Sequence, residues 1–279
     1  TQLSLYGARY RSDPAASSAT GDGFELNPHR ENDRFSVGVT HPLIVAPDHW
    51  LRVGARLYGV NDNTDYEIVG YSQTISERTN VRALAVEGDW RKSDAKQLRI
   101  VSAGVYQGIN GLGAKSETNL TGTRYDLDFF RLRLSGVQSD GFFDNWQGVM
   151  SGALYWSDDS LPESERAVGG GQNCGRGYPE DQASGDKGWG VAYEVNYSFN
   201  REGEWVKLLQ PYVVLDKAKT WFNELPFKGS DMSSAAAGLR FGDKRYYNIA
   251  FEVAKPMSDI ALDSFNRRPR YTLSFSYQL

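Results

Sequence analysis

The chain has 279 residues, with 31 lysines and arginines against 35 aspartates and glutamates and a formal net charge of -4. A near-neutral chain without a basic block is not typical of a nucleic-acid binder, and an aromatic content of 13% excludes a disordered chain. No run of 18 apolar residues predicts a membrane-spanning helix, and the single Cys174 excludes an internal disulfide framework and a cysteine-rich zinc site.

Alternation of apolar and polar residues with a period of two recurs along the whole chain and predicts β-strands. Residues 50–58 alternate in this way from Leu51 onward, and the pattern returns in 189–199 and in 271–279. The expected strands, in chain order, are 2–10, 34–42, 49–60, 64–75, 80–91, 97–108, 124–137, 146–157, 165–171, 188–199, 210–221, 233–242, 246–254 and 270–279.

These are about fourteen strands of roughly ten residues, the length that crosses a bilayer when the strand is tilted. Short links at 43–48, 76–79 and 243–245 alternate with longer polar links. Because outer-membrane barrels join their strands by short periplasmic turns and long surface loops, the pattern predicts an all-β fold, a transmembrane antiparallel β-barrel. One link of fifteen residues, 109–123, falls where a short turn is expected.

A soluble β-sandwich or β-helix is the alternative fold, since it also has alternating strands. It does not explain the aromatic and apolar rows, such as Tyr193, Val195 and Tyr197, because a water-facing sheet rarely exposes them. We therefore favour the barrel. Its lumen is expected to be lined by charged residues, among them Arg52, Arg56, Asp126, Asp128, Glu194 and Asp216.

Residue patterns typical of enzymes do not stand out in the sequence. His29, His41 and His49 are scattered, whereas metal sites need clustered ligands, so loop or interface positions are favoured. The G-I-N-G-L-G run at 108–113 opens no helix and indicates a turn, and the acidic stretch 158–163 indicates a solvated turn. We expect no enzymatic activity, no metal and no cofactor.

The segment 166–199 is long, polar and rich in glycine. Such a loop can fold back into a space where side chains would not fit. Arg176 within it would need a carboxylate partner inside a lumen, and Asp216 is a candidate because the alternation of 210–221 directs it inward. Spacing alone favours a solvated surface position for Arg176.

A family resemblance changes that balance. The run Arg176-Gly177-Tyr178, followed by S-G-D-K-G at 184–188, resembles the V-R-G-Y/F signature of two-partner secretion transporters of the haemolysin activation/secretion type. These POTRA-domain barrels share a superfamily with the outer-membrane barrel assembly factor, and the signature marks their sixth loop, which folds into the lumen. Other stretches that resemble the family are Leu209–Tyr212 with Asp216, 34–43, 254–257 and the closing R-P-R-Y-T-L-S-F-S-Y-Q-L.

The resemblance implies a lumen-folded loop between the expected strands at 165–171 and 188–199, anchored by an ion pair between Arg176 and Asp216. It implies functional loop residues at Arg176, Gly177, Tyr178, Gly185 and Asp186. Three positions depart from the family pattern: Gly175 stands in place of valine, Ala218 in place of glycine and Leu279 in place of a terminal phenylalanine.

The family barrel has sixteen strands, with the signature loop between the eleventh and the twelfth. Nine expected strands precede the loop here and five follow it. We therefore interpret residues 1–279 as the barrel domain, and we expect two strands, the POTRA domains and a plug helix upstream of Thr1.

The function implied by the resemblance is a pore in the bacterial outer membrane that exports a large partner protein to the cell surface. Its expected partners are that secreted protein, the lipid bilayer with lipopolysaccharide, and the barrel assembly machinery during biogenesis, but no nucleic acid. Two other functions stay open: a barrel-insertion factor of the same superfamily, and a diffusion porin or translocator of a surface-tethered enzyme.

Overall fold

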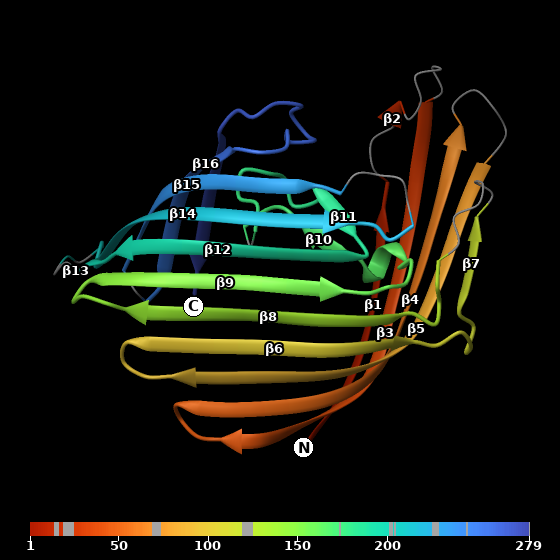
Figure 1. The fold of residues 1–279 in the computed structure, drawn as a ribbon, viewed down its shortest axis with the longest axis horizontal. Helices are drawn as coiled ribbons and strands as arrows, with labels where there is room; N and C mark the ends of the chain where they lie inside the picture. Colours follow the sequence, from red (N-terminus) through yellow and green to blue (C-terminus); the bar gives the residue numbers. More distant parts are fainter. Residues whose placement is uncertain are drawn as a thin grey trace.

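The computed structural model describes residues 1–13, 17–18, 25–68, 74–118, 125–172, 174–200, 203, 205–224, 229–243 and 245–278. These ranges form mainly β-strands, most of them in one large antiparallel sheet (Figure 1). Their helical element is the 3-10 turn η1 (Glu163–Glu165). Within the same ranges, the structure contains no helix whose length and hydropathy would allow it to cross a membrane. The predicted all-β, antiparallel class is confirmed.

A continuous path of strands makes up most of this sheet, and each strand pairs antiparallel with the next. In order across the sheet it contains β1 (Gln2–Ser12), β3 (Glu25–Val45), β4 (His49–Ile68), β5 (Thr74–Ser93), β6 (Gln97–Gly108), β8 (Phe130–Gly141), β9 (Trp146–Trp156), β12 (Lys187–Tyr197), β14 (Leu208–Trp221), β15 (Asp231–Gly242), β16 (Tyr247–Pro256) and β17 (Arg270–Tyr277). Three short strands pair at its margins: β2 (Ser17–Ser18), β7 (Lys115–Thr118) and β13 (Phe199–Asn200). The hairpin of β10 (Ala167–Gly169) and β11 (Ala183–Gly185) forms a second, two-stranded sheet.

Three strand predictions differ from the structure, one of them being 124–137, because β8 begins only at Phe130. Residues 64–75 are not a strand of their own, because β4 continues without a turn to Ile68 and pairs with β3 and β5 along its length. Residues 165–171 contain β10, which pairs with β11 and not with the large sheet. With one strand fewer before it, the link after β6 lies at the end of the sheet where the long links gather, so its length is no longer anomalous.

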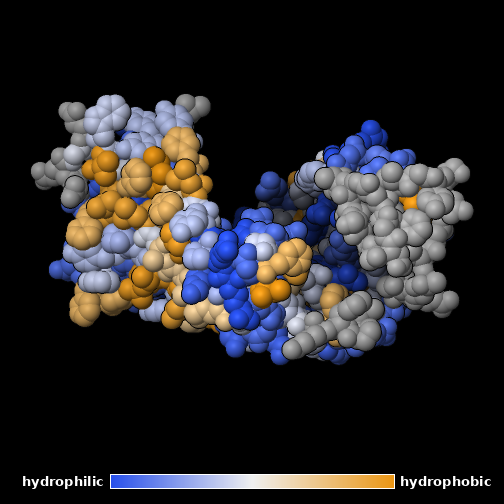
Figure 2. Space-filling model, turned by 90° about the horizontal axis from the view of Figure 1, so that it is seen from above, coloured by the Kyte–Doolittle hydropathy of each residue, from blue (hydrophilic) through white to orange (hydrophobic). Residues whose placement is uncertain are grey.

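The outer face of the sheet is apolar where the strands adjoin the short links. Phe35, Leu57 and Leu84 are exposed there on neighbouring strands. β3, β4 and β5 have 21, 20 and 20 residues, about twice the length that a tilted strand needs to cross a bilayer. Their distal halves are polar, and the hydrophilic and hydrophobic residues gather on different arms of the molecule (Figure 2). The distal halves therefore project beyond the apolar band.

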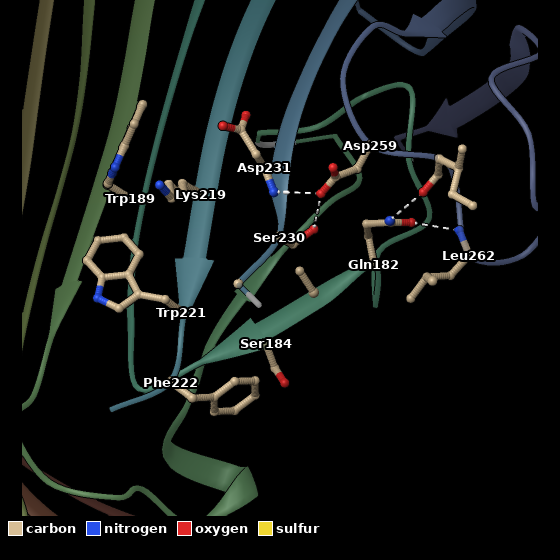
Figure 3. A pocket seen from close by; sticks show the side chains of 13 residues that line it. Gln182, Ser184, Trp189, Lys219, Trp221, Phe222, Ser230, Asp231, Asp259 and Leu262 are labelled. Atoms are coloured by element: carbon tan, nitrogen blue, oxygen red, sulfur yellow. Dashed lines mark hydrogen bonds between the residues drawn. The ribbon is translucent and has the colours of Figure 1, made fainter. Parts of the chain in front are cut away.

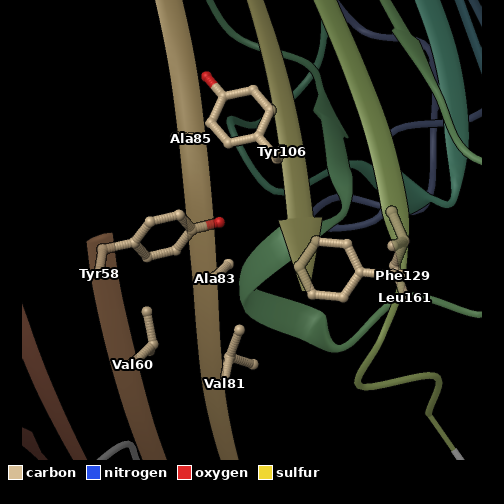
Figure 4. Packing of buried hydrophobic residues seen from close by; sticks show 8 residues of the cluster. All are labelled: Tyr58, Val60, Val81, Ala83, Ala85, Tyr106, Phe129 and Leu161. Carbon is tan, nitrogen blue, oxygen red and sulfur yellow. The ribbon is translucent and has the colours of Figure 1, made fainter. Parts of the chain in front are cut away.

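A buried cluster joins the inner face of β4, β5 and β6 to the loops at the long-link end (Figure 4). Phe129 and Leu161 come from two different links and are fully buried against Val81 and Ala83 of β5. Burying a leucine or phenylalanine side chain contributes about 1.5–3 kcal/mol. The cluster therefore holds the start of the link after β9 against the wall.

Small side chains line the inner faces of β12 to β16 and leave space next to the wall. They are Gly188, Gly190, Ala192, Ala218, Ser234, Ala236 and Ala254. Their outward neighbours are large: Val191 and Leu215, for example, are exposed while Ala192 and Ala218 are buried. The space on the inner side is filled by the link between β9 and β12.

Candidate functional site

The inward segment is the link of residues 157–186 between β9 and β12, described except for Asn173. It contains η1, the β10–β11 hairpin and, between these two strands, the R-G-Y tip. Gly170, Gly171 and Gly175 have φ angles of 119°, 72° and 110°, a region that L side chains rarely adopt. A Cβ on Gly190 of β12 would lie 2.7 Å from the Cys174 sulfur, so the segment packs directly on the inner wall.

Gly177 and Tyr178 fix the tip to β15 and β16. The Tyr178 side chain is 1% exposed, and its hydroxyl lies 3.2 Å from the carbonyl oxygen of Ser233, to which it donates. The Gly177 amide donates to the hydroxyl of Ser234 over 3.1 Å. A Cβ on Gly177 would lie 2.6 Å from the backbone nitrogen of Pro256. Only glycine therefore allows the tip this close to β16.

Asp216 holds the backbone of the tip. Its carboxylate is buried and accepts hydrogen bonds from the Ser234 hydroxyl at 2.6 Å and from the Arg176 amide at 3.4 Å. Because Ser234 also accepts the Gly177 amide, one side-chain pair on the wall binds two consecutive peptide groups. The predicted anchoring residue thus contacts the predicted loop.

The predicted ion pair between Arg176 and Asp216 is wrong. The Arg176 guanidinium pairs with Glu252 of β16 and lies 3.7 Å from a carboxylate oxygen of Glu194 on β12. The backbone amide of Arg176 faces Asp216, whereas its side chain extends along the wall to the carboxylates of β16 and β12. Both side chains of the pair are desolvated, with exposures of 13% for Arg176 and 4% for Glu252.

Further residues complete a charge-balanced socket around Arg176. Tyr212 donates its hydroxyl to Glu252 at 2.8 Å. The Arg240 guanidinium lies 3.9 Å from the centre of the Tyr212 ring and donates to both carboxylate oxygens of Glu194, at 2.6 and 2.7 Å. Two cations and two anions thus share one desolvated network, in which each carboxylate has a cationic partner. We call these residues the Arg176 socket.

A second anchor holds the inward segment at η1. The Glu165 side chain is 3% exposed, accepts the Tyr58 hydroxyl at 2.8 Å and lies 3.0 Å from the Arg131 guanidinium. Arg131 lies 4.0 Å from the centre of the Tyr106 ring. This anchor reaches β4 and β8, whereas the Arg176 socket belongs to β12, β14, β15 and β16. The sequence prediction missed Glu165, Glu252 and Arg240.

Gly185 and Asp186 close the segment where it returns to the wall. The buried Asp186 carboxylate accepts the amides of Leu161 and Asn223, both at 2.9 Å, and so ties the two ends of the segment to the link after β14. A Cβ on Gly185 would lie 2.6 Å from the carbonyl oxygen of Trp221. Both predicted loop residues thus have structural contacts at the base of the segment.

The other predicted lumen residues separate into two groups. Arg52 and Arg56 lie on the inner face of β4, where Arg56 pairs with Glu87 at 3.2 Å. Asp126 and Asp128 do not line the wall, because β8 begins only at Phe130 and both residues belong to the link before it. Leu279 lies outside the described residues.

Two further features surround the tip. Burial raises the pKa of the Cys174 thiol to about 11 within the inward segment. At the long-link end, a cavity of about 930 Å³ adjoins Gln182, whose side-chain amide donates to Ile260 and accepts the Leu262 amide, each at 2.9 Å (Figure 3). Gln182 thereby ties the inward segment to the link between β16 and β17.

Comparisons with known proteins identify the family and the fold. A family profile described as haemolysin secretion/activation protein ShlB/FhaC/HecB matches residues 75–241. The chain belongs to this family. Members are outer-membrane transporters of bacteria, so the predicted family and location are confirmed. No curated protein matches the chain by sequence.

Solved structures share the fold. CdiB from Escherichia coli matches with a TM-score of 0.72 and 18% identity, over 98% of this chain and 49% of that protein. CdiB from Acinetobacter baumannii matches with a TM-score of 0.66 and 16% identity, over 98% of this chain and 46% of that protein. The predicted β-barrel fold class is confirmed, and the chain spans about half the length of the solved structures it matches.

Proposed function

We propose that this ShlB/FhaC/HecB family chain is the wall and inward segment of a pore that exports a partner protein in two-partner secretion. The observation that carries the proposal is the R-G-Y tip, which is folded against the inner wall and held there by the Arg176 socket. Family membership and the apolar outer face support the same conclusion.

The wall is suited to the passage of an unfolded chain. Between β1 and β17, strand pairing satisfies the backbone polar groups of the inner strands, as a wall in hydrocarbon requires. Inner-face charges of both signs, such as Arg56 and Glu87, keep the bore wet without a strong preference for one charge of cargo. Folding of the exported protein outside the cell then gives direction without ATP, and the chain acts as a channel and not as an enzyme.

Residues 1–279 act in this proposal as the barrel domain of a longer transporter. POTRA domains of that protein capture the unfolded partner in the periplasm by strand addition and deliver it to the barrel. The barrel assembly machinery inserts the finished sheet into the outer membrane. The inward segment props the inner wall, with the tip on β15 and β16 and η1 on β4 and β8.

The test is secretion of the partner by the full-length transporter. Arg176→Ala is compared with Arg52→Ala, which also removes an inner-face arginine, but one that contacts Asp89 and Trp50 of the wall and not the inward segment. Partner protein is quantified in the medium, and barrel insertion is checked by heat-modifiable gel migration of outer-membrane fractions. We expect Arg176→Ala to lower secretion with normal insertion and Arg52→Ala to secrete like the wild type.

Normal export by Arg176→Ala would refute the role of the tip. Loss of other outer-membrane proteins on depletion of the transporter, with no loss of a secreted partner, would instead identify a barrel-insertion factor. Open conductance that is independent of the inward segment, with no protein cargo, would identify a diffusion porin. The neighbouring reading frame supplies the candidate partner for all of these measurements.

A further inference from the structure

Three lysines lie on the outer face of the sheet, on β14 and β16 at the long-link end. β14 exposes Val213 and Leu215 outward, at 58% and 63%, and strand alternation places Lys217 and Lys219 on the same face. Lys255 of β16 is exposed on this face as well, because its register partner Ala235 pairs with Leu215. We call Lys217, Lys219 and Lys255 the lysine patch.

The lysine patch lies at the edge of the apolar band, at the long-link end. Toward the short links, each of these strands exposes apolar residues, whereas Lys217 and Lys255 stand directly beyond Leu215 and Val253. Trp189 and Trp221 lie close to Lys219 (Figure 3). Tryptophan beside lysine is typical of the boundary between hydrocarbon and headgroups.

The charges of the lysine patch are poorly neutralised by the protein. Lys187 nearby is paired with Asp158 at 2.6 Å, but Lys217 has only Asp231, at 4.0 Å. In the part of the chain that the structure describes, no carboxylate lies within 4.0 Å of the Lys219 or Lys255 amines. β14 and β16 are separated by a single strand, roughly 10 Å of sheet, and Lys217 stands two residues, about 7 Å, beyond the level of Lys255. The flexible side chains of Lys217 and Lys255 can therefore reach one anionic group, with Lys219 two residues further along β14.

An apolar groove begins beside the lysine patch. Its volume is about 460 Å³, and its floor includes Gly136 and Gly152, which are paired directly across β8 and β9. The groove is lined further by Leu134, Met150, Leu154 and Val191. Val191 is paired with Gly152 on one side and with Lys217 on the other. A lipid whose headgroup binds the lysine patch can therefore place an acyl chain in the groove, which begins on the strand next to β14.

We propose that the lysine patch and this groove bind one phosphorylated glycolipid of the outer leaflet, of the lipid A type. The lysines take the headgroup phosphate, and the glycine-floored groove takes an acyl chain. Long links mark the cell-surface end of outer-membrane barrels, so this leaflet is the one that the patch meets. The assignment of the leaflet rests on the proposed outer-membrane role.

The experiment measures lipid A binding to the purified full-length transporter in detergent micelles. The variant Lys217→Gln/Lys219→Gln/Lys255→Gln is compared with Lys92→Gln/Lys96→Gln/Lys207→Gln, which removes the same charge near the short links. We expect the patch variant to bind bisphosphorylated lipid A at least about tenfold more weakly and the control variant to bind like the wild type. Arginine at the three patch positions should retain binding, which separates charge loss from misfolding.

Two more arms test the chemistry. Dephosphorylated lipid A should bind the wild type and the patch variant equally weakly, and Gly152→Leu should weaken binding by filling the groove. Equal binding by the wild type and the patch variant, equal loss in the control variant, or equally tight binding of phosphatidylglycerol would overturn the proposal. Because no secreted partner is needed, the result is independent of the export assay that tests the proposed function.

Discussion

Arg176→Ala removes the side chain that links the inward segment to β12 and β16. In the structure the guanidinium is desolvated between Glu252 and Glu194, and its amide remains bound to Asp216. The substitution therefore breaks one charged attachment and leaves the backbone attachment in place. Its effect should be undocking of the tip, while the pairing of the wall strands is unchanged.

The magnitude follows from the partners that remain. Glu194 keeps both hydrogen bonds to Arg240, but Glu252 is left at 4% exposure with the Tyr212 hydroxyl as its donor. Removing one partner of a buried ion pair costs about 3–5 kcal/mol, and the retained tyrosine places the cost near about 3 kcal/mol. The equilibrium between docked and undocked tip should shift by about 150-fold.

Cys174 reports that shift without an added probe, because it is the single cysteine of the chain and lies two residues from the arginine. Its half-buried thiol, with the pKa raised to about 11, should react slowly with maleimide at neutral pH, since the thiolate is the nucleophile. Peptide mapping assigns the label, and heat-modifiable migration confirms the folded barrel. We expect alkylation of Arg176→Ala to be about a hundredfold faster.

A pair of charge exchanges identifies the partner. Arg176→Glu with Glu252→Arg should restore slow alkylation of Cys174 in part, because the buried ion pair is re-formed with reversed sign. Arg176→Asp with Asp216→Arg should not, because Asp216 binds the backbone amide and not the guanidinium. Wild-type alkylation by Arg176→Ala, or rescue by the Asp216 exchange alone, would refute the assignment of Glu252.

Three other substitutions test separate contacts. Gly177→Ala should undock the tip, because the added Cβ would collide with the backbone of β16. We expect fast alkylation of Cys174 in this variant, and slow alkylation would contradict the close approach of the tip to β16. Glu165→Gln should weaken the contact with Arg131 and so expose η1 to limited proteolysis, while the alkylation of Cys174 stays slow. A digestion pattern like that of the wild type would refute the role of Glu165 as a second anchor. Asp243→Ala should lower the urea midpoint of unfolding at neutral pH, because three backbone amides hold the pKa of Asp243 below its ordinary 3.8. Because the folded state favours the ionised carboxylate of Asp243, its contribution to stability is fully present above pH 3.8 and is lost as the pH falls through the lowered pKa. The urea midpoints of wild type and variant should therefore converge in acid. A difference in midpoint that stays constant with pH would contradict the prediction.

Strand identity was predictable because alternation is local, but strand number was not. In β4, residues 61–65 are polar on both faces, which is typical of a turn, yet they continue as a strand between β3 and β5. Such a stretch is stable because it projects beyond the apolar band, where neither face needs to be hydrophobic. Periodicity cannot distinguish this extension from a turn.

The sequence predicted which residues form the tip but not the carboxylate that pairs with Arg176. The R-G-Y run indicated a segment that packs inside the wall, and the inner small residues beginning with Gly188 and Gly190 were a second signal in the sequence. The Arg176 guanidinium pairs with Glu252 while its backbone amide binds Asp216, and this depends on the three-dimensional path of the tip, which sequence spacing does not contain. Gly175, where the family has valine, has a φ of 110°, which only glycine adopts without strain.

The two anchors of the inward segment have opposite polarity. At the tip a cation of the segment enters an anionic wall site, whereas at η1 the anion Glu165 meets Arg131 of the wall. A cation can compete with Arg176 for Glu252 and with Arg131 for Glu165, and an anion can compete for the arginine of each pair. The charge of a competing group therefore does not select one anchor over the other, and release of the tip alone depends on its other contacts, such as those of Gly177 and Tyr178.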